Sequence, residues 1–110
     1  MVEQILKDTI AKFNKKADED PKLAGEIAEL HRVIEFEITD GEWYHFVLDH
    51  GHIGELYKGK ADNPDIHVTC DSETVRQIAS GELRPMKALA LRKIKVKASL
   101  EDMLTLRKFF

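Results

Sequence analysis

The sequence predicts an α+β fold, with helices packed on one face of a mostly antiparallel five-stranded sheet. Apolar residues recur at helical spacing before residue 20, alternate with polar ones in several runs between residues 31 and 70, and return to helical spacing after residue 71. Consecutive strands joined by short turns pair antiparallel, and this order excludes a regular βαβ repeat. One layer of helices and one of strands would then enclose a core.

The first element is an amphipathic helix that ends before Pro21. Its apolar residues recur at helical spacing: Val2, Ile5, Leu6, Ile10 and Phe13. Residues 22–30 fit either a short helical turn interrupted by Gly25 or a loop that leads into the sheet.

Two alternating runs, residues 34–38 and 43–48, predict a β-hairpin. Asp40-Gly41 between them is a dipeptide favoured in two-residue hairpin turns, because both central positions take positive φ. One face of the hairpin is apolar and consists of Ile34, Phe36, Ile38, Tyr44, Phe46 and Leu48.

Two further strands are expected, from Ile53 to Lys58 and from Asp65 to Cys70. Cys70 is the single cysteine of the chain, so it cannot form an internal disulfide. Because it ends an apolar alternation, we expect it to be a small core residue rather than a reactive thiol.

The remaining elements carry clear end signals. Asp71 and Ser72 are suited to cap a short helix, and Gly81 suits its left-handed C-terminal position. Pro85 can open the next helix. A strand with alternating lysines is then expected over Lys93–Ala98, followed by a helix that starts with a capping box at residues 99–102 and runs to Phe110.

The 110 residues fit one domain, 1–110. The start shows no signal-peptide pattern, and no apolar run approaches the roughly 18 residues that cross a bilayer, so a cytoplasmic location is expected. The net charge of −3 divides into +6 from residue 84 onward and −9 before it. This asymmetry indicates a local anion-attracting surface, or simply solvated lysines, rather than nucleic-acid binding.

The segment from Asn63 to Phe110 resembles the sterol carrier protein type two family. The likeness is carried by Asn63-Pro64-Asp65 before a strand, by the stretch GELRPMKA at residues 81–88, by the basic strand KIKVKA at residues 93–98, and by LTLRK at residues 104–108. Turn, helix start, strand and closing helix follow in register without a gap. Upstream, the helix and the hairpin agree in order but not in diagnostic residues.

The resemblance implies a small lipid-binding domain whose curved sheet and covering helices enclose an apolar tunnel, with no cofactor, metal or chemistry of its own. The family's ligands are sterols, fatty acids, fatty acyl-CoA esters and phospholipids. Two departures stand out: the family often has glycine near the positions of Arg92 and Ala98, and it commonly continues beyond the point corresponding to Phe110. A shorter closing segment would leave the tunnel more open.

Candidate ligand-binding residues follow from these patterns. Flexible methionines and positions on the closing helix suit varied apolar ligands, whereas the two phenylalanines of the hairpin are more readily explained as ordinary core. The candidates are Phe36, Phe46, Met86, Leu89, Met103, Leu106 and Phe110. Arg84 and Lys87, beside the start of the Pro85 helix, are candidates for an anionic head group.

The histidines offer a different chemistry. His50 and His52 have the i, i+2 spacing that places both rings on one face of a strand, and His45 is near in sequence. A catalytic zinc takes three such ligands with an open position. Because Gly51 and Gly54 indicate a turn here, and because no further catalytic signature is present, surface histidines and a non-enzyme are the preferred interpretation.

Three hypotheses therefore remain. The first is non-catalytic binding or transfer of a lipid or another elongated apolar molecule, with transient contact to a membrane surface. The second is a protein-interaction or homodimerisation module that uses the same apolar groove. The third is a metal-dependent enzyme that uses His45, His50 and His52.

Overall fold

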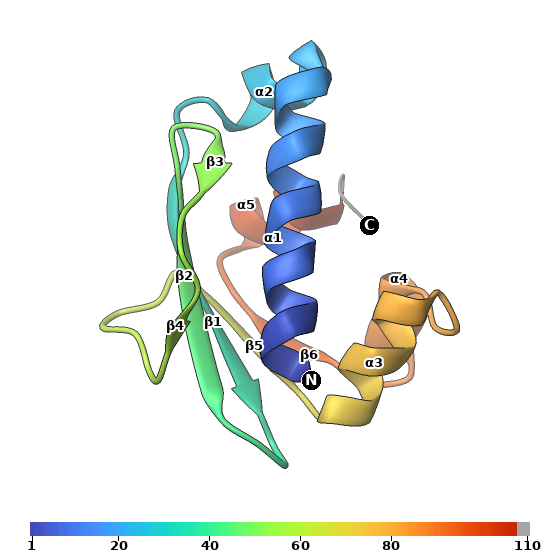
Figure 1. Ribbon diagram of the computed structural model, residues 1–110. Coiled ribbons are helices and arrows are strands. Elements are labelled where there is room, and N and C mark those ends of the chain that lie inside the picture. Colours follow the sequence, from blue (N-terminus) through green and yellow to red (C-terminus); the bar gives the residue numbers. More distant parts are fainter. Residues whose placement is uncertain (108–110) are drawn as a thin grey trace.

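The computed structural model describes the backbone of residues 1–107 and the side chains of residues 1–105. This part of the chain contains five helices and six strands (Figure 1). In order they are α1 (Val2–Glu19), α2 (Pro21–Ile27), β1 (His31–Ile38), β2 (Trp43–Asp49), β3 (His52–Ile53), β4 (Tyr57–Lys58), β5 (Ile66–Cys70), α3 (Ser72–Ser80), α4 (Pro85–Ala90), β6 (Lys95–Lys97) and α5 (Leu100–Arg107).

The strands form one sheet in the order β3-β2-β1-β5-β6, and β4 pairs separately with β2. Strands β1 and β5 are parallel, and the other pairs are antiparallel. Figure 1 shows the helices on one side of the sheet and the connection from β4 to β5 on the other. The predicted two-layer α+β fold with a mostly antiparallel sheet is confirmed.

The sheet has six strands rather than five, because the expected strand Ile53–Lys58 is divided. His52–Ile53 and Tyr57–Lys58 pair with different parts of β2. Between them the chain leaves the ladder and Leu56 packs against the core. The prediction of β6 was also too long, since the amide of Lys93 bonds to the carbonyl of Ala88 at 2.9 Å and so belongs to the turn after α4.

The hairpin of β1 and β2 is confirmed, but its turn is not the predicted two-residue type. The last register pair is Glu37 with Trp43, and neither Asp40 nor Gly41 has positive φ. Contacts outside the hairpin shape the turn instead. The amide of Thr39 bonds to the carbonyl of Cys70 at 2.9 Å, and the carboxylate of Asp40 accepts the amide of Ser72 at 2.8 Å.

Side-chain caps set the helix boundaries. Asp20 accepts the amide of Lys22 at 3.0 Å and starts α2, so the ambiguous segment after Pro21 is a short helix. Asp71 caps α3 by accepting the amide of Thr74 at 2.8 Å, and Gly81 ends it with φ of 84°. Both signals at the ends of α3 were correctly predicted from the sequence.

The core lies between α1 and the inner face of the sheet. In the first half of α1, Leu6 packs in a cluster with Ile38 and Tyr44. In the second half, Ala17 packs in a second cluster with Leu48. The predicted apolar face of the hairpin is therefore the face that meets the helices.

Candidate functional site

An aromatic pair occupies the inner face of the sheet. Phe36 on β1 and Phe46 on β2 have ring centroids 5.6 Å apart at a tilted angle. Phe46 is buried, whereas Phe36 is half-buried and packs against the first core cluster. Two of the predicted ligand-lining residues thus come together in the apolar layer between sheet and helices.

The two helices nearest the C-terminus leave much apolar surface uncovered. On α4, Ala88 is fully buried, Leu89 is half-buried and Met86 is 44% exposed. On α5, Met103 is half-buried while Leu104 is 53% exposed. Exposed apolar side chains of this kind are candidates to contact a ligand or a partner. Leu106 is in the helical part of α5, but its side chain and the whole of Phe110 lie outside the described residues.

The predicted head-group residues are both exposed. Arg84 precedes α4 in an extended conformation, and Lys87 is in that helix. Neither forms an ion pair with a side chain among the described residues, so both are available to an anion.

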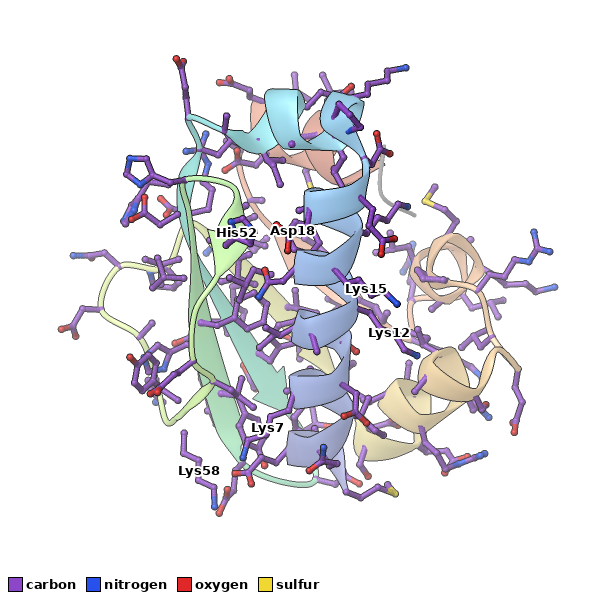
Figure 2. All side chains as sticks on the ribbon, turned by 45° about the horizontal axis from the view of Figure 1, so that its top comes forward. Lys7, Lys12, Lys15, Asp18, His52 and Lys58 are labelled. Atoms are coloured by element: carbon purple, nitrogen blue, oxygen red, sulfur yellow. The ribbon has the colours of Figure 1, made fainter. Side chains whose placement is uncertain are left out.

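The three histidines of the metal hypothesis have separate partners. The Nδ1 atom of His45 is 3.0 Å from the carbonyl oxygen of Gly59, and the Nδ1 atom of His50 is 2.9 Å from Asp49. His52 points toward α1, where its Nε2 atom is 2.6 Å from Asp18 (Figure 2). Across the part of the chain that the structure describes, no group of histidine, cysteine, aspartate and glutamate side chains is arranged to hold a metal ion.

A buried charged cluster on the outer face of the sheet was not predicted. Glu35 belongs to the face expected to be solvated, yet it is only 4% exposed. Its carboxylate accepts the amide of Ala61 at 2.6 Å and lies 2.7 Å from Nδ1 of His67. The connection from β4 to β5 crosses this face and shields Glu35 from water. The residues next to Glu35 in the sequence give no sign of this burial.

His67 is held between two carboxylates. Its Nε2 atom is 3.1 Å from Glu37, on the same face of β1 as Glu35. An ionised carboxylate can only accept a hydrogen bond. Each of the two contacts is therefore a hydrogen bond only where the ring nitrogen that faces the carboxylate carries a hydrogen. We refer to Glu35, His67 and the amide of Ala61 as the outer clasp.

In the part of the chain that the structure describes, two of the surface hollows have many polar side chains in their walls. One, of about 630 Å³, adjoins the outer clasp and reaches Trp43, Asp65 and Lys97. The other, of about 410 Å³, lies between the end of β5, the start of α3 and the segment before β6. Among the described residues, no helix is both long and apolar enough to cross a membrane.

Residues 10–110 match the model of the SCP-2 sterol transfer family. The chain belongs to this family. Membership makes it a relative of lipid-binding and lipid-transfer domains, as the resemblance in its C-terminal half indicated. No curated protein matches the sequence.

Solved structures share the fold at low sequence identity. The sterol carrier protein 2 like 2 of Aedes aegypti is 18% identical, with a TM-score of 0.66 over 100% of both chains. The palmitated form of the Aedes aegypti protein is 20% identical, with a TM-score of 0.65 over 91% of this chain and 88% of that one. An inverting sec-alkylsulfatase from Pseudomonas sp. is 18% identical, with a TM-score of 0.58; the match covers 76% of this chain and 13% of that chain.

Proposed function

We propose that residues 1–110 act as one non-catalytic domain that binds and transfers a lipid or another elongated apolar molecule in an apolar tunnel between sheet and helices. The observation that carries this proposal is the exposed apolar surface of α4 and α5, in a member of the sterol transfer family. A bound chain would cover Met86, Leu89 and Met103 and reach the ring of Phe36. Burial of apolar area against these side chains would supply the affinity.

Native mass spectrometry of the freshly purified protein tests the proposal. A co-purified fatty acid, acyl-CoA, sterol or phospholipid is the expected result. A stable dimer without lipid would overturn it in favour of the interaction module, because the same apolar surface would then be covered by a second copy.

A pair of exposed apolar residues provides a matched comparison. Met86 on α4 is 44% exposed and Tyr57 on β4 is 49% exposed, so replacement of either by glutamate leaves the core intact. Met86→Glu is expected to weaken binding of a fluorescent fatty acid about tenfold, since a charge would enter the apolar wall. Tyr57→Glu should bind like the wild type. Equal affinities of the two variants would contradict the placement of the ligand.

Lys87 provides a test of the head-group residues. Lys87→Glu should weaken binding of a fatty acyl-CoA about tenfold while sterol binding stays unchanged, because only the former carries phosphates that a lysine attracts. Competition against a fluorescent fatty acid measures both affinities. The same loss for both ligands would show that Lys87 does not contact a head group.

We also propose transient contact with an anionic membrane surface through the basic segment that begins at residue 84. Arg84 and Lys87 are exposed there and form no ion pair with a side chain that the structure describes. Binding to phosphatidylglycerol vesicles that weakens as salt is added, with no binding to phosphatidylcholine vesicles, is the expected result. Equal binding to both vesicle types would contradict an electrostatic contact.

A further inference from the structure

The smaller hollow, about 410 Å³ in volume, has three basic side chains in its wall. Arg92 and Lys93 come from the turn after α4, and Lys95 from the start of β6. The rest of the wall includes the side chains of Thr39, Thr69 and Gln77. Their hydroxyl and amide groups can donate hydrogen bonds.

The basic side chains of this hollow are available to a ligand, whereas its acidic ones are engaged. Arg92, Lys93 and Lys95 form no ion pair with any side chain that the structure describes. Of the two carboxylates in the wall, Asp71 caps α3 and Glu73 binds Arg76 at 3.0 Å. Hydrogen bonds from Thr74, together with the charge of Lys93, lower the pKa of Asp71.

Arg92 occupies a position where the backbone favours glycine. Its φ is 60°, in the left-handed region that L side chains rarely adopt. The turn itself is fixed by backbone hydrogen bonds from Arg92 to Leu89 and from Lys93 to Ala88, which any residue could make. Strained positions of this kind cluster where a side chain serves a ligand.

The hollow also borders the apolar layer. Cys70 lies in its wall and belongs to the core cluster that contains Val75 and Leu6. A polar group held here therefore lies beside the region proposed to contain the apolar chain.

We propose that this hollow binds the phosphoryl group of a ligand, with the guanidinium of Arg92 as its main contact. Paired N–H groups of arginine match two oxygens of a phosphate, and two lysines nearby suit its second negative charge. As a phosphate site for a phosphate-bearing lipid, distinct from the contact tested at Lys87, this assignment rests on the proposed function. Inorganic phosphate carries the same chemistry without the apolar chain.

Decyl phosphate and decanol carry the same apolar chain, so the difference between their affinities measures the contribution of the phosphate group. Calorimetric titrations should give an affinity about tenfold higher for decyl phosphate, the effect of one or two charge-assisted hydrogen bonds. Arg92→Gly should lose most of this preference and keep the affinity for decanol. Because glycine adopts positive φ freely, this variant should melt at the same or a higher temperature, so lost binding cannot be ascribed to unfolding.

Lys22→Gln is the matched control, since it removes one exposed positive charge from α2, which lies at the opposite end of α1 from α3 (Figure 1). It should keep the preference for decyl phosphate. Equal affinities of the wild type for the two compounds, or an undiminished preference in Arg92→Gly, would overturn the site and leave the proposed lipid function standing.

Inorganic phosphate distinguishes the remaining outcomes. If neither decyl compound binds, the proposed function fails. Changes in the amide NMR shifts of Thr69, Arg92 and Lys95 on addition of inorganic phosphate then show whether the hollow binds phosphate. Shifts that disappear in Arg92→Gly would support a site for free phosphate. Unchanged spectra of the wild type would overturn it.

Discussion

Burial determines the chemistry of Cys70. The residue is 5% exposed and ends the apolar alternation of β5. Burial raises the pKa of its thiol to about 11, with smaller contributions from the charges of Asp71 and Asp40. The thiolate is the reactive form, so the prediction of a small, unreactive core residue gains a physical basis.

Reaction with a thiol reagent tests this residue directly. At pH 8 the folded protein should react with iodoacetamide far more slowly than the protein in concentrated urea, because the thiol is both buried and protonated. Mass spectrometry of timed samples measures the two rates. Similar rates would mean that Cys70 is accessible in the folded state.

Two glycines should respond to alanine in opposite directions. Gly25 lies in α2 with no atom near the position of an added Cβ, whereas Gly81 has φ of 84° at the end of α3. Gly25→Ala should raise the free energy of unfolding by about 0.5–1 kcal/mol. Gly81→Ala should lower it by about 1–2 kcal/mol through left-handed strain. Urea denaturation measures both, and changes of the same sign would mean that backbone conformation does not distinguish the two positions.

Side chains connect elements that the backbone alone would leave apart. The outer clasp fastens the connection between β4 and β5 to the middle of the sheet through Glu35. On α5, the carboxylate of Asp102 is 2.8 Å from Nε of Arg32 on β1, and this ion pair is largely buried. Hydrogen bonding to Asp102 raises the pKa of Arg32. Helix α5 is thus attached to the sheet by a polar link.

The two glutamates of β1 offer a matched test of the clasp. Glu35→Ala removes the acceptor of the partly buried Ala61 amide and of His67, so the free energy of unfolding should fall by about 1–3 kcal/mol. Glu37→Ala removes one partly exposed contact and should cost less than about 1 kcal/mol. Urea denaturation gives the values, and hydrogen exchange at Ala61 should accelerate in Glu35→Ala alone. Equal effects of the two variants would show that Glu35 does not hold the connection.

Across the whole molecule, two aspartates meet at the start of α3, and one of them links the hairpin to the helical layer. Asp40 binds Ser72 at the start of α3, and Asp71 caps the same helix. Hydrogen bonds from Ser72 lower the pKa of Asp40, and those from Thr74 lower the pKa of Asp71, both from an ordinary value of 3.8. The folded protein therefore binds protons at these groups less tightly than the unfolded chain does.

The sign of the pH dependence follows from linkage. The contribution of these carboxylates is fully present above their unfolded pKa and is lost as the pH falls through the lower pKa of the folded state. Thermal stability should therefore decrease below about pH 4. In the double variant Asp40→Asn and Asp71→Asn the decrease should be shallower, since asparagine caps a helix without titrating. An unchanged pH profile would exclude these two groups as its cause.

Local sequence patterns were enough to predict most of the elements and the family. Helical and alternating periods located most elements, Asp71 and Gly81 bounded α3, and the turn, strand and helix from Asn63 onward carried the resemblance that the family match confirmed. These signals are local, because a cap or a periodic face depends on residues a few positions apart. For the same reason Met86 and Lys87 could be assigned to α4 in advance.

Features that depend on contacts between distant residues could be recognised only in the folded structure. The parallel pairing of β1 with β5 brings His67 beside Glu35, and the crossing connection buries that carboxylate. In the same way, the turn after α4 brings Arg92 to the end of β5, where it completes a basic hollow that no local pattern encodes. Burial and charge at these positions are set by chain segments that are distant in the sequence, so they emerge only when the sheet is assembled.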